Sequence, residues 1–230
     1  MTRKIIVALS SPVATSFRAK KAANSLDIDV HKKSQHRLEV DVDLDGEWNV
    51  GLIVGASGSG KTTLAHEGWG ADCFRSNIDL ARPVIDQFPD DLDYDTCQRL
   101  LNGTGLTQVP CWIRPAGTLS NGQRTRAEVA LHMASAADPI LIDEWTSVVD
   151  RTVAKVMSHS VQKFTRRNAR RIVLCSCHYD VVEWLDPDWI IDCNKQAFID
   201  RRCLRRSERE RTERLTFTVQ IGRASCRERV

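Results

Sequence analysis

The sequence contains no long hydrophobic run. None of its apolar stretches approaches the roughly 18 residues that a membrane-spanning helix needs, so we expect no transmembrane segment. Near the N-terminus, Arg3 and Lys4 precede apolar residues 5–9, which faintly resembles a signal peptide. That apolar segment is shorter than the roughly 7–15 residues of a signal peptide, and we interpret residues 5–10 as a first β-strand instead.

The cysteines form no disulfide framework of the kind found in small secreted proteins. Eight of them are scattered at positions 73, 97, 111, 175, 177, 193, 203 and 226. This distribution favours reduced thiols and a cytoplasmic location. Cys175, Cys177 and His178 lie close together but lack the C-x₂₋₄-C spacing and the second ligand pair of a zinc site. We interpret them as small buried residues on a central strand.

The main body of the chain has no excess of positive charge. Residues 201–230 hold ten Arg and four Glu, and the first 200 residues carry 23 basic and 26 acidic side chains. The net charge of +3 therefore arises in the C-terminal segment. A domain that binds nucleic acid concentrates positive charge on its folded body. The composition therefore supports neither a nucleic-acid partner nor a membrane partner.

The length of 230 residues and the hydrophobic fraction of 42% are typical of one large α/β domain. Residues 17–36 and much of 71–118 look irregular. Buried or half-buried strands are expected at 37–44, 50–54, 139–142, 171–175 and 189–192, with helices at 62–70, 96–101, 119–136, 152–166 and 181–185. Strands that alternate with helices predict a mostly parallel sheet with helices on both faces.

Residues 55–63 read Gly-Ala-Ser-Gly-Ser-Gly-Lys-Thr-Thr and fit the phosphate-binding pattern G-x-x-x-x-G-K-[ST]. A buried strand before the motif and a helix after it distinguish it from a Gly/Ser-rich surface turn. Glycines allow backbone N–H groups to face phosphate oxygens at the start of the helix. Lys61 would reach the β- and γ-phosphates, and Thr62 would bind Mg²⁺. We predict that a nucleoside triphosphate is bound by Gly55, Ser57, Gly58, Ser59, Gly60, Lys61, Thr62 and Thr63.

Four further motifs follow in order. Residues 119–123, Leu-Ser-Asn-Gly-Gln, look like the LSGGQ signature of ATP-binding-cassette (ABC) ATPases, with Asn121 in place of its first glycine. Residues 140–144, Ile-Leu-Ile-Asp-Glu, look like the Walker B strand of that family. Residues 147–150, Ser-Val-Val-Asp, resemble its D-loop, and His178 resembles its H-loop histidine. The chain therefore resembles an ABC-type P-loop ATPase, with ATP and Mg²⁺ as the implied ligands.

The resemblance implies a role for each of these residues. Asp143 would hold Mg²⁺, Glu144 would act as general base on the attacking water, and His178 would hydrogen-bond the γ-phosphate. Ser120 and Gly122 would meet the γ-phosphate of ATP held by a second subunit, so a homodimer is expected to form on ATP binding. Asn121, Gln123 and Asp150 are further predicted nucleotide-binding residues. From the residues alone, Glu144 could also be a solvated carboxylate at a strand end, and Ser120 an ordinary helix N-cap.

Two features of the family are difficult to place. Gln87 and Gln98 are both candidates for the Q-loop glutamine, and Gln87 is the one that we predict. Neither Tyr nor Trp occupies the expected position of the adenine-stacking aromatic. Phe17 lies far upstream of that position, and His31 or His36 could stack on the adenine instead of a Tyr or Trp. The preference for ATP over other nucleotides therefore rests on the resemblance alone.

The resemblance covers roughly residues 37–195. We predict that residues 1–200 form the nucleotide-binding domain, with a helical subdomain at about 71–136. The interval between Lys61 and Ser120 is shorter than in transport ATPases, which implies a reduced helical subdomain.

The segments 143–153 and 177–184 resemble a soluble phage and bacterial subgroup in which the ATPase is followed by a GNAT-type acetyltransferase domain. Residues 201–220 would then begin a truncated downstream region. Residues 221–230 match the conceptual translation of a short-read sequencing adapter, and we interpret them as a non-native tail rather than as a natural basic segment.

These observations predict Mg²⁺-dependent ATP hydrolysis by a soluble ABC-type ATPase. One alternative is the ATP-binding subunit of an ABC transporter, against which the short helical region and the unclear Q-loop argue. The other is a P-loop kinase that acts on a small molecule, a class that needs neither the signature nor the H-loop histidine.

Overall fold

The computed structural model describes residues 3–11, 16–25, 34–70 and 78–202. Its elements, in chain order, are β1 (Arg3–Ser11), α1 (Phe17–Asn24), β2 (Ser34–Val42), β3 (Val50–Val54), α2 (Lys61–Trp69), η2 (Ile85–Gln87), α3 (Tyr94–Gly103), α4 (Val109–Trp112), η3 (Ala116–Thr118), α5 (Asn121–Ala134), β4 (Ile140–Ile142), α6 (Arg151–Arg167), β5 (Ile172–Ser176), α7 (Val181–Leu185), β6 (Trp189–Asp192) and β7 (Ala197–Asp200). Residues 26–33, 71–77 and 203–230 lie outside the described part, and with them all but the first two residues of the predicted C-terminal segments 201–220 and 221–230.

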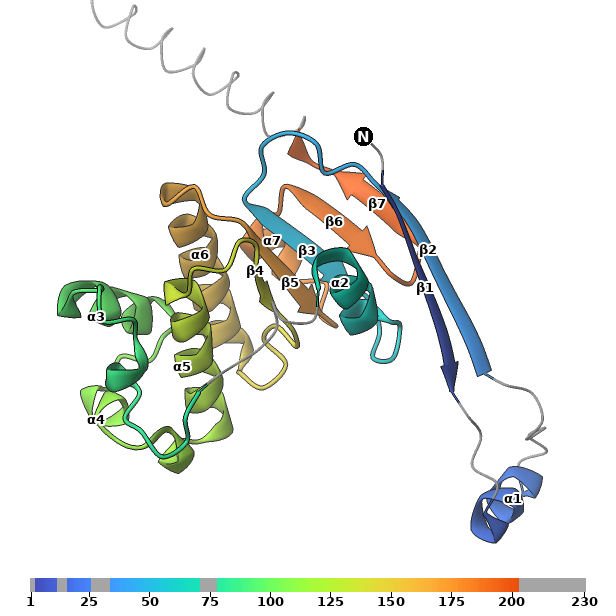
Figure 1. The fold of residues 1–230 in the computed structure, drawn as a ribbon, viewed down its shortest axis with the longest axis horizontal. Helices are drawn as coiled ribbons and strands as arrows, with labels where there is room; N and C mark the ends of the chain where they lie inside the picture. The colour runs from blue at the N-terminus through green and yellow to red at the C-terminus, as the bar shows by residue number, and fades with distance from the viewer. Residues whose placement is uncertain (1–2, 12–15, 26–33, 71–77, 203–230) are drawn as a thin grey trace, which may run out of the picture.

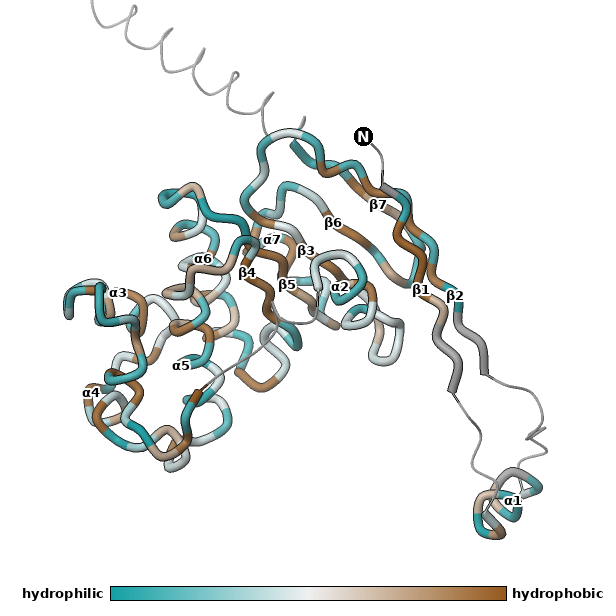
Figure 2. The backbone as a smooth tube through the Cα atoms, in the orientation of Figure 1, coloured by the Kyte–Doolittle hydropathy of each residue, from teal (hydrophilic) through white to brown (hydrophobic). Residues whose placement is uncertain are grey.

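A five-stranded sheet with the order β4-β5-β3-β6-β7 forms the centre of the fold (Figure 1). β3 pairs in parallel with β5 and β6, and β4 pairs in parallel with β5. All residues of these four strands are buried, as expected for parallel strands covered on both faces. Figure 2 shows the corresponding hydrophobic segments at the centre of the molecule. The predicted α/β class with a mostly parallel sheet is confirmed.

Residues 189–192 were predicted to be the final strand, and this was wrong. β7 pairs antiparallel with β6 and forms one edge of the sheet. Its four residues are half-buried or exposed, so they present no buried apolar run from which a strand could have been predicted.

β1 and β2 form a separate two-stranded antiparallel sheet, which is called the arm below. The pairing runs from Arg3 opposite Val42 to Ser11 opposite Ser34. One face of the arm is buried, and α2 packs against β1. In Figure 1 the arm projects away from the main sheet and ends near α1.

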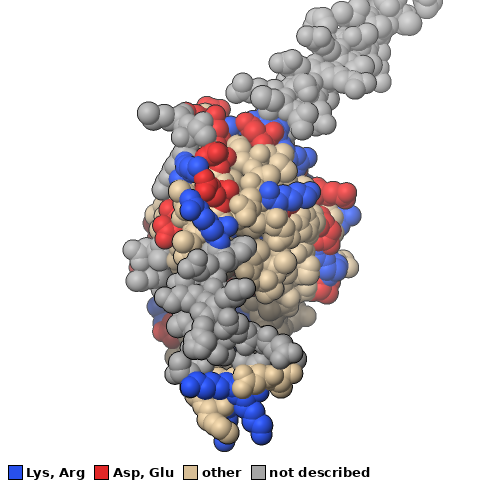
Figure 3. Space-filling model, turned by 90° about the vertical axis from the view of Figure 1, so that its right-hand side faces the viewer, with Lys and Arg blue, Asp and Glu red and all other residues tan. Residues whose placement is uncertain are grey.

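α1 corrects the expectation of irregular structure across residues 17–36, because its eight residues are rich in alanine and lysine, which favour helix. Its basic side chains Arg18, Lys20 and Lys21 are exposed, and Figure 3 shows Lys and Arg side chains at the lower end of the molecule, where α1 lies. Elsewhere on that face both signs of charge are interspersed. Figure 3 thus shows no broad field of one sign across the main body.

Helices α3, α4 and α5 lie beside α6 on one side of the sheet (Figure 1). α5 packs against α3 and β4, and Trp112 of α4 is buried, with its indole N–H donating to the carbonyl of Leu106 at 2.7 Å. α3, α5, α6 and α7 lie at positions where the sequence predicted helices. α4 and the two short 3₁₀ helices, η2 and η3, were not predicted, because prolines divide this region into pieces too short for a periodic pattern.

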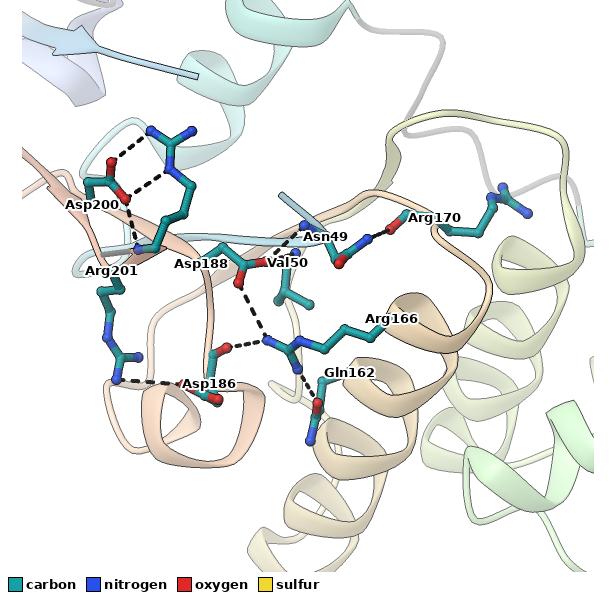
Figure 4. Close-up of polar contacts among 10 residues, drawn as sticks. Asn49, Val50, Gln162, Arg166, Arg170, Asp186, Asp188, Asp200 and Arg201 are labelled. Atoms are coloured by element: carbon teal, nitrogen blue, oxygen red, sulfur yellow. Dashed lines mark hydrogen bonds and ion pairs between the residues drawn. The ribbon is translucent and has the colours of Figure 1, made fainter. Parts of the chain in front are cut away.

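The starts of β3 and β6 are fixed together by Asp188 (Figure 4). The buried Asp188 carboxylate accepts the backbone N–H groups of Asn49 and Val50 at 2.8 and 2.9 Å, and the Asp188 N–H donates to the Val50 carbonyl at 2.7 Å. Arg166 of α6 lies 3.8 Å from the carboxylate. These contacts fix the beginning of β3 rigidly, at the end of the strand opposite to the phosphate-binding motif.

A tryptophan cluster joins α2 to the sheet. The ring of Trp189 in β6 stacks on Trp69 with centroids 5.6 Å apart and meets Trp48 edge-on at 5.4 Å. Trp189 also covers Gly51, where an added Cβ would lie 2.0 Å from the ring. Glycine is therefore required at position 51 for the indole to pack on β3.

Candidate functional site

The phosphate-binding motif forms the turn between β3 and α2. Gly58 and Gly60 have φ values of 76° and 91°, in the left-handed region that favours glycine. Gly60 is the N-cap of α2, and no side chain caps this end of the helix. The first N–H groups of α2 are therefore available to an anion, which is the arrangement expected of a phosphate site.

Lys61 lies inside this loop. Its side chain is 7% exposed, and its ammonium donates to the carbonyl oxygens of Gly55 and Ala56 at 2.9 and 2.8 Å. Gly55 leaves no space for a side chain, since an added Cβ would lie 2.4 Å from the Ser59 hydroxyl oxygen and 3.0 Å from Cys193. That hydroxyl is buried and lies beside the Cys193 thiol. The loop thus contains a cation and a hydroxyl that both suit phosphate oxygens.

The two predicted magnesium ligands are adjacent. Thr62, at the start of α2, donates its hydroxyl hydrogen to Oδ2 of Asp143 at 2.7 Å, while Oδ1 of Asp143 accepts the N–H of Glu144 at 2.8 Å. Mg²⁺ prefers oxygen ligands and is commonly held by one or two protein groups together with substrate phosphates and water. The described residues contain no group of three or more His, Cys, Asp or Glu that could hold a metal. The pair therefore fits a nucleotide-dependent Mg²⁺ site.

Glu144 is exposed and has a φ of 51°, which is uncommon for a residue other than glycine. The residue after it is firmly held. Trp145 is buried, its N–H donates to the Cys175 carbonyl at 2.7 Å, and its indole N–H donates to Ser158 at 3.2 Å. Strained backbone of this kind persists where the surroundings impose it and is frequent at functional sites.

His178 lies just beyond the end of β5 and is half-buried. Its backbone N–H donates to the hydroxyl of the buried Ser176 at 3.1 Å, which fixes the turn that carries the imidazole. The imidazole itself makes no hydrogen bond to another residue in the described part of the chain, and so it is available to a ligand.

Burial keeps the two thiols under the loop protonated. Desolvation raises the pKa of the Cys193 thiol to about 11 against an opposing effect of the Lys61 charge, and burial raises the pKa of Cys175 well above its ordinary value. Cys175 and Ser176 are buried on β5, and Cys177 is half-buried. The two buried thiols pack as small neutral groups beside β3.

The signature residues occupy the start of α5. Ser120 is its N-cap and forms a capping box with Gln123, in which the Ser120 hydroxyl accepts the Gln123 backbone N–H at 3.3 Å and the Gln123 side-chain oxygen Oε1 accepts the Ser120 backbone N–H at 3.0 Å. Asn121 is exposed and Gly122 half-exposed. An added Cβ at Gly122 would lie 3.4 Å from the Val148 carbonyl, so the start of α5 packs against the predicted D-loop of its own chain.

Asp150 has a structural role in this chain as the N-cap of α6. Its carboxylate accepts the N–H groups of Thr152 and Val153, both at 3.0 Å. The predicted contacts of Asp150 and of the signature residues with a nucleotide of a second subunit stay predictions.

Gln87 is engaged within its own loop. Its amide accepts the Asp79 N–H at 2.7 Å and donates to the carbonyls of Asp79 and Arg82 at 2.9 and 3.0 Å. These contacts give the side chain a structural task, and its predicted role at the nucleotide stays a prediction. Phe17 is 81% exposed on α1, at the far end of the arm in Figure 1, while His31 lies outside the described residues.

Three residues near the loop were not foreseen from the sequence. Asn194 accepts the N–H of Ala56 with its side-chain oxygen at 3.2 Å, and it also contacts Tyr179 and the buried Asp192. None of the three is among the residues predicted for the nucleotide site. The signal that could have located Asn194 is a polar turn, residues 192–195, directly after a buried strand that neighbours β3.

The fold is that of P-loop ATPase domains of the ABC type. The post-hydrolysis ATP-binding cassette MJ0796, dimeric and bound to ADP and Pi, aligns with a TM-score of 0.55 at 13% identity over 84% of this chain and 98% of that chain. The archaeal ribosome recycling factor aABCE1, solved with the ribosomal stalk protein aP1, aligns with a TM-score of 0.56 at 19% identity over 68% of this chain and 34% of that chain. A putative cobalt transport ATP-binding protein, cbiO-2 (ST1066), aligns with a TM-score of 0.55 at 16% identity over 86% of this chain and 77% of that chain.

At these identities the structural likeness establishes the fold alone. No protein-family model matches the sequence, and no curated protein matches it either. Among the described residues there is no helix of sufficient length and apolar character to cross a membrane.

Proposed function

We propose that the protein binds ATP with Mg²⁺ and hydrolyses it to ADP and phosphate. The observation that carries this proposal is the 2.7 Å contact between Thr62 and Asp143, which brings a P-loop hydroxyl to a carboxylate at the end of β4. Glu144 follows immediately and is exposed. The phosphate-binding motif, two oxygen groups that suit Mg²⁺ and a second carboxylate are thus neighbours, which supports hydrolysis of a phosphoanhydride.

The residues of the chain would act mainly by positioning and by neutralising charge. The glycine-rich loop and the start of α2 would accept the β- and γ-phosphates on backbone N–H groups. The Lys61 ammonium, now held by two loop carbonyls, would donate to phosphate oxygens instead. When bound, Mg²⁺ would neutralise charge on the β- and γ-phosphates, and Thr62 and Asp143 would hold it.

Glu144 and His178 would complete the site. Glu144 would accept a proton from the attacking water as general base. His178, whose imidazole is free of hydrogen bonds to described residues, would contact the γ-phosphate and hold the water near Glu144. Residues 119–123 and His178 favour hydrolysis over transfer to a small-molecule acceptor, because a P-loop kinase needs neither the signature nor an H-loop histidine.

We further propose a soluble head-to-tail homodimer with two composite sites. The start of α5 carries the helix N-terminal N–H groups and the Ser120 hydroxyl, which together suit the γ-phosphate held by a second copy. Dimeric cassettes are among the structural neighbours, which supports this arrangement.

Glu144→Gln tests the proposal. The variant should lose ATP turnover but form a dimer with ATP and Mg²⁺ that light scattering detects, because the nucleotide is bound and not consumed. Glu47→Gln alters an exposed carboxylate outside the site and should behave like the wild type. A Glu144→Gln variant that remains monomeric with ATP and Mg²⁺ would overturn the dimer, and full turnover in it would overturn the assignment of the base.

A second candidate function is that of the ATP-binding subunit of an ABC transporter. One observation favours it: a cavity of about 470 Å³ lies beside η2 and the start of α3, lined by Arg82, Phe88 and Tyr94 among others. It lies in the predicted helical subdomain, which is where transport ATPases of the family meet their membrane partner. Structural neighbours include a putative metal-chelate type ABC transporter. Recovery of the full chain with an integral membrane subunit in detergent, and not from the aqueous fraction, would favour this function over the first.

A further inference from the structure

The short segment that carries His178 is attached to its surroundings on both sides. Residues 177–180 link β5 to α7, and the two residues after His178 each make side-chain contacts with a different part of the site. Asp180 contacts the start of α6, whereas Tyr179 contacts the turn after β6. The position of the imidazole therefore depends on both attachments.

The first attachment is an ion pair between Arg151 and Asp180. Arg151 Nε lies 3.0 Å from one oxygen of Asp180, and Arg151 Nη2 contacts the other oxygen, so the pair is bidentate. The guanidinium carbon lies 4.9 Å from the ring centroid of Trp184, and Nη1 lies 3.5 Å from the Thr146 hydroxyl. Because Arg151 directly follows Asp150, this ion pair joins the His178 segment to the turn after Glu144.

The second attachment reaches the phosphate-binding loop. The Tyr179 hydroxyl donates to the buried Asp192 carboxylate at 3.1 Å and accepts the Asn194 side-chain N–H at 3.2 Å. The side-chain oxygen of Asn194 accepts the Ala56 N–H at 3.2 Å. Asp192 is 2% exposed and also accepts the backbone N–H groups of Asn194 and Lys195, which fixes the turn.

We propose that Arg151 and Asn194 are positioning residues that hold His178 between the phosphate-binding loop and the turn after Glu144. This inference rests on the proposed ATPase function. Arg151 fixes the segment relative to Glu144, and Asn194, through Tyr179, fixes it relative to Ala56. The position of the imidazole therefore depends on how the nucleotide binds to the loop.

The exposure of these groups makes the proposal testable without unfolding the protein. The side chains of Arg151 and Asp180 are 40% and 49% exposed, and ion pairs at the surface contribute little to global stability. Their loss should therefore change local geometry and leave the fold intact. A merely structural role would instead appear as a lower melting temperature with unchanged kinetics.

A charge exchange tests the first attachment. Arg151→Asp and Asp180→Arg should each lower kcat for ATP by roughly tenfold, with KM and the melting temperature nearly unchanged. The double variant, with the charges exchanged, should recover most of the lost rate. Arg151→Lys keeps the charge but lacks the bidentate fork, and should lie between the wild type and Arg151→Asp. Lys155→Asp, an exposed charge reversal on the same helix, is the matched control.

Asn194→Ala and Tyr179→Phe test the second attachment. Asn194→Ala should raise amide hydrogen exchange in the peptide that contains Ala56 and should weaken binding of a fluorescent ATP analogue severalfold. Tyr179→Phe should raise exchange in residues 177–180 without changing the melting temperature. Both exchange measurements use nucleotide-free protein and do not depend on turnover.

The outcomes separate this inference from the proposed function. If the wild type neither binds nor hydrolyses ATP, the proposed function fails, and unchanged exchange in the variants would overturn the attachments independently. If the wild type hydrolyses ATP while the single charge variants keep their kcat, the positioning role is wrong. A charge-exchanged double variant that is folded but no faster than the slower single variant would also overturn it.

Discussion

The Thr62 hydroxyl donates to the Asp143 carboxylate at 2.7 Å, across 81 positions of sequence. The contact requires the start of α2 and the end of β4 to lie side by side, although β4 is separated from β3 by β5. In this contact the two groups that are best suited to Mg²⁺ are hydrogen-bonded to each other. Metal binding would break this hydrogen bond, because Thr62 would bind Mg²⁺ and Asp143 would hold the ion through its water shell.

Thr62→Val should therefore weaken nucleotide binding only when Mg²⁺ is present. Valine has the shape of threonine without the hydroxyl, so the fold should persist. The affinity for a fluorescent ATP analogue should fall by at least roughly tenfold with Mg²⁺ and change little with EDTA. Equal affinities of variant and wild type in Mg²⁺ would exclude Thr62 as a ligand.

Ser120→Asp should separate the capping role of Ser120 from its proposed role at a nucleotide. Aspartate is a good N-cap, so the melting temperature should be retained, whereas Ser120→Ala should cost about 1 kcal/mol. The added carboxylate should repel the γ-phosphate of a second subunit. In the Glu144→Gln background it should abolish the ATP-dependent dimer in light scattering, and a persistent dimer would argue against the trans contact.

Gly51→Ala should destabilise the protein by about 2–3 kcal/mol, because the added methyl group would lie 2.0 Å from the Trp189 ring. The ring cannot move freely, since Trp69 stacks on it and Trp48 meets its edge. Urea unfolding followed by tryptophan fluorescence measures the change. Gly103→Ala is the control, because its Cβ would meet Ser160 at an ordinary 3.7 Å. Equal stability of the two variants would show that the indole repacks at no cost.

Stability should fall at alkaline pH through Cys193. Burial raises the pKa of its thiol from 9.0 to about 11. Between these values the unfolded chain binds fewer protons than the folded chain, so the contribution of Cys193 is fully present below about pH 9 and is lost as the pH rises toward 11. From pH 8 to pH 10.5 the wild type should lose about 2 kcal/mol more than Cys193→Ala. If urea unfolding showed that the wild type and Cys193→Ala lose the same free energy of unfolding over this pH range, the titrating group would lie elsewhere, for example at Cys175.

Much of the fold could be predicted because the parallel strands are buried on both faces and therefore read as apolar runs. Residues 50–54 coincide with β3, and residues 171–175 overlap β5 in all but one position. Prediction failed where burial is partial. β7 lacks an apolar run, and α1 depends on the helix propensity of alanine and lysine rather than on a buried face.

The candidate site divides in the same way. Residues 55–63 can be recognised in the sequence because phosphate binding needs glycines, a lysine and a threonine at fixed spacing. Asn194 does not, because a single amide that accepts one backbone N–H leaves no pattern in the sequence. The left-handed backbone at Glu144 was equally hidden, since its cause is the anchoring of Trp145 to a neighbouring strand.

The sequence by itself determined the α/β class, the phosphate-binding loop and the order of its accompanying motifs, because these depend on local periodicity and on residue types at short spacing. Only the tertiary structure decided which groups meet. The contact of Thr62 with Asp143, the ion pair of Arg151 with Asp180 and the bond of Asn194 to Ala56 each join distant segments. Such contacts follow from strand order and helix packing, which no local pattern encodes.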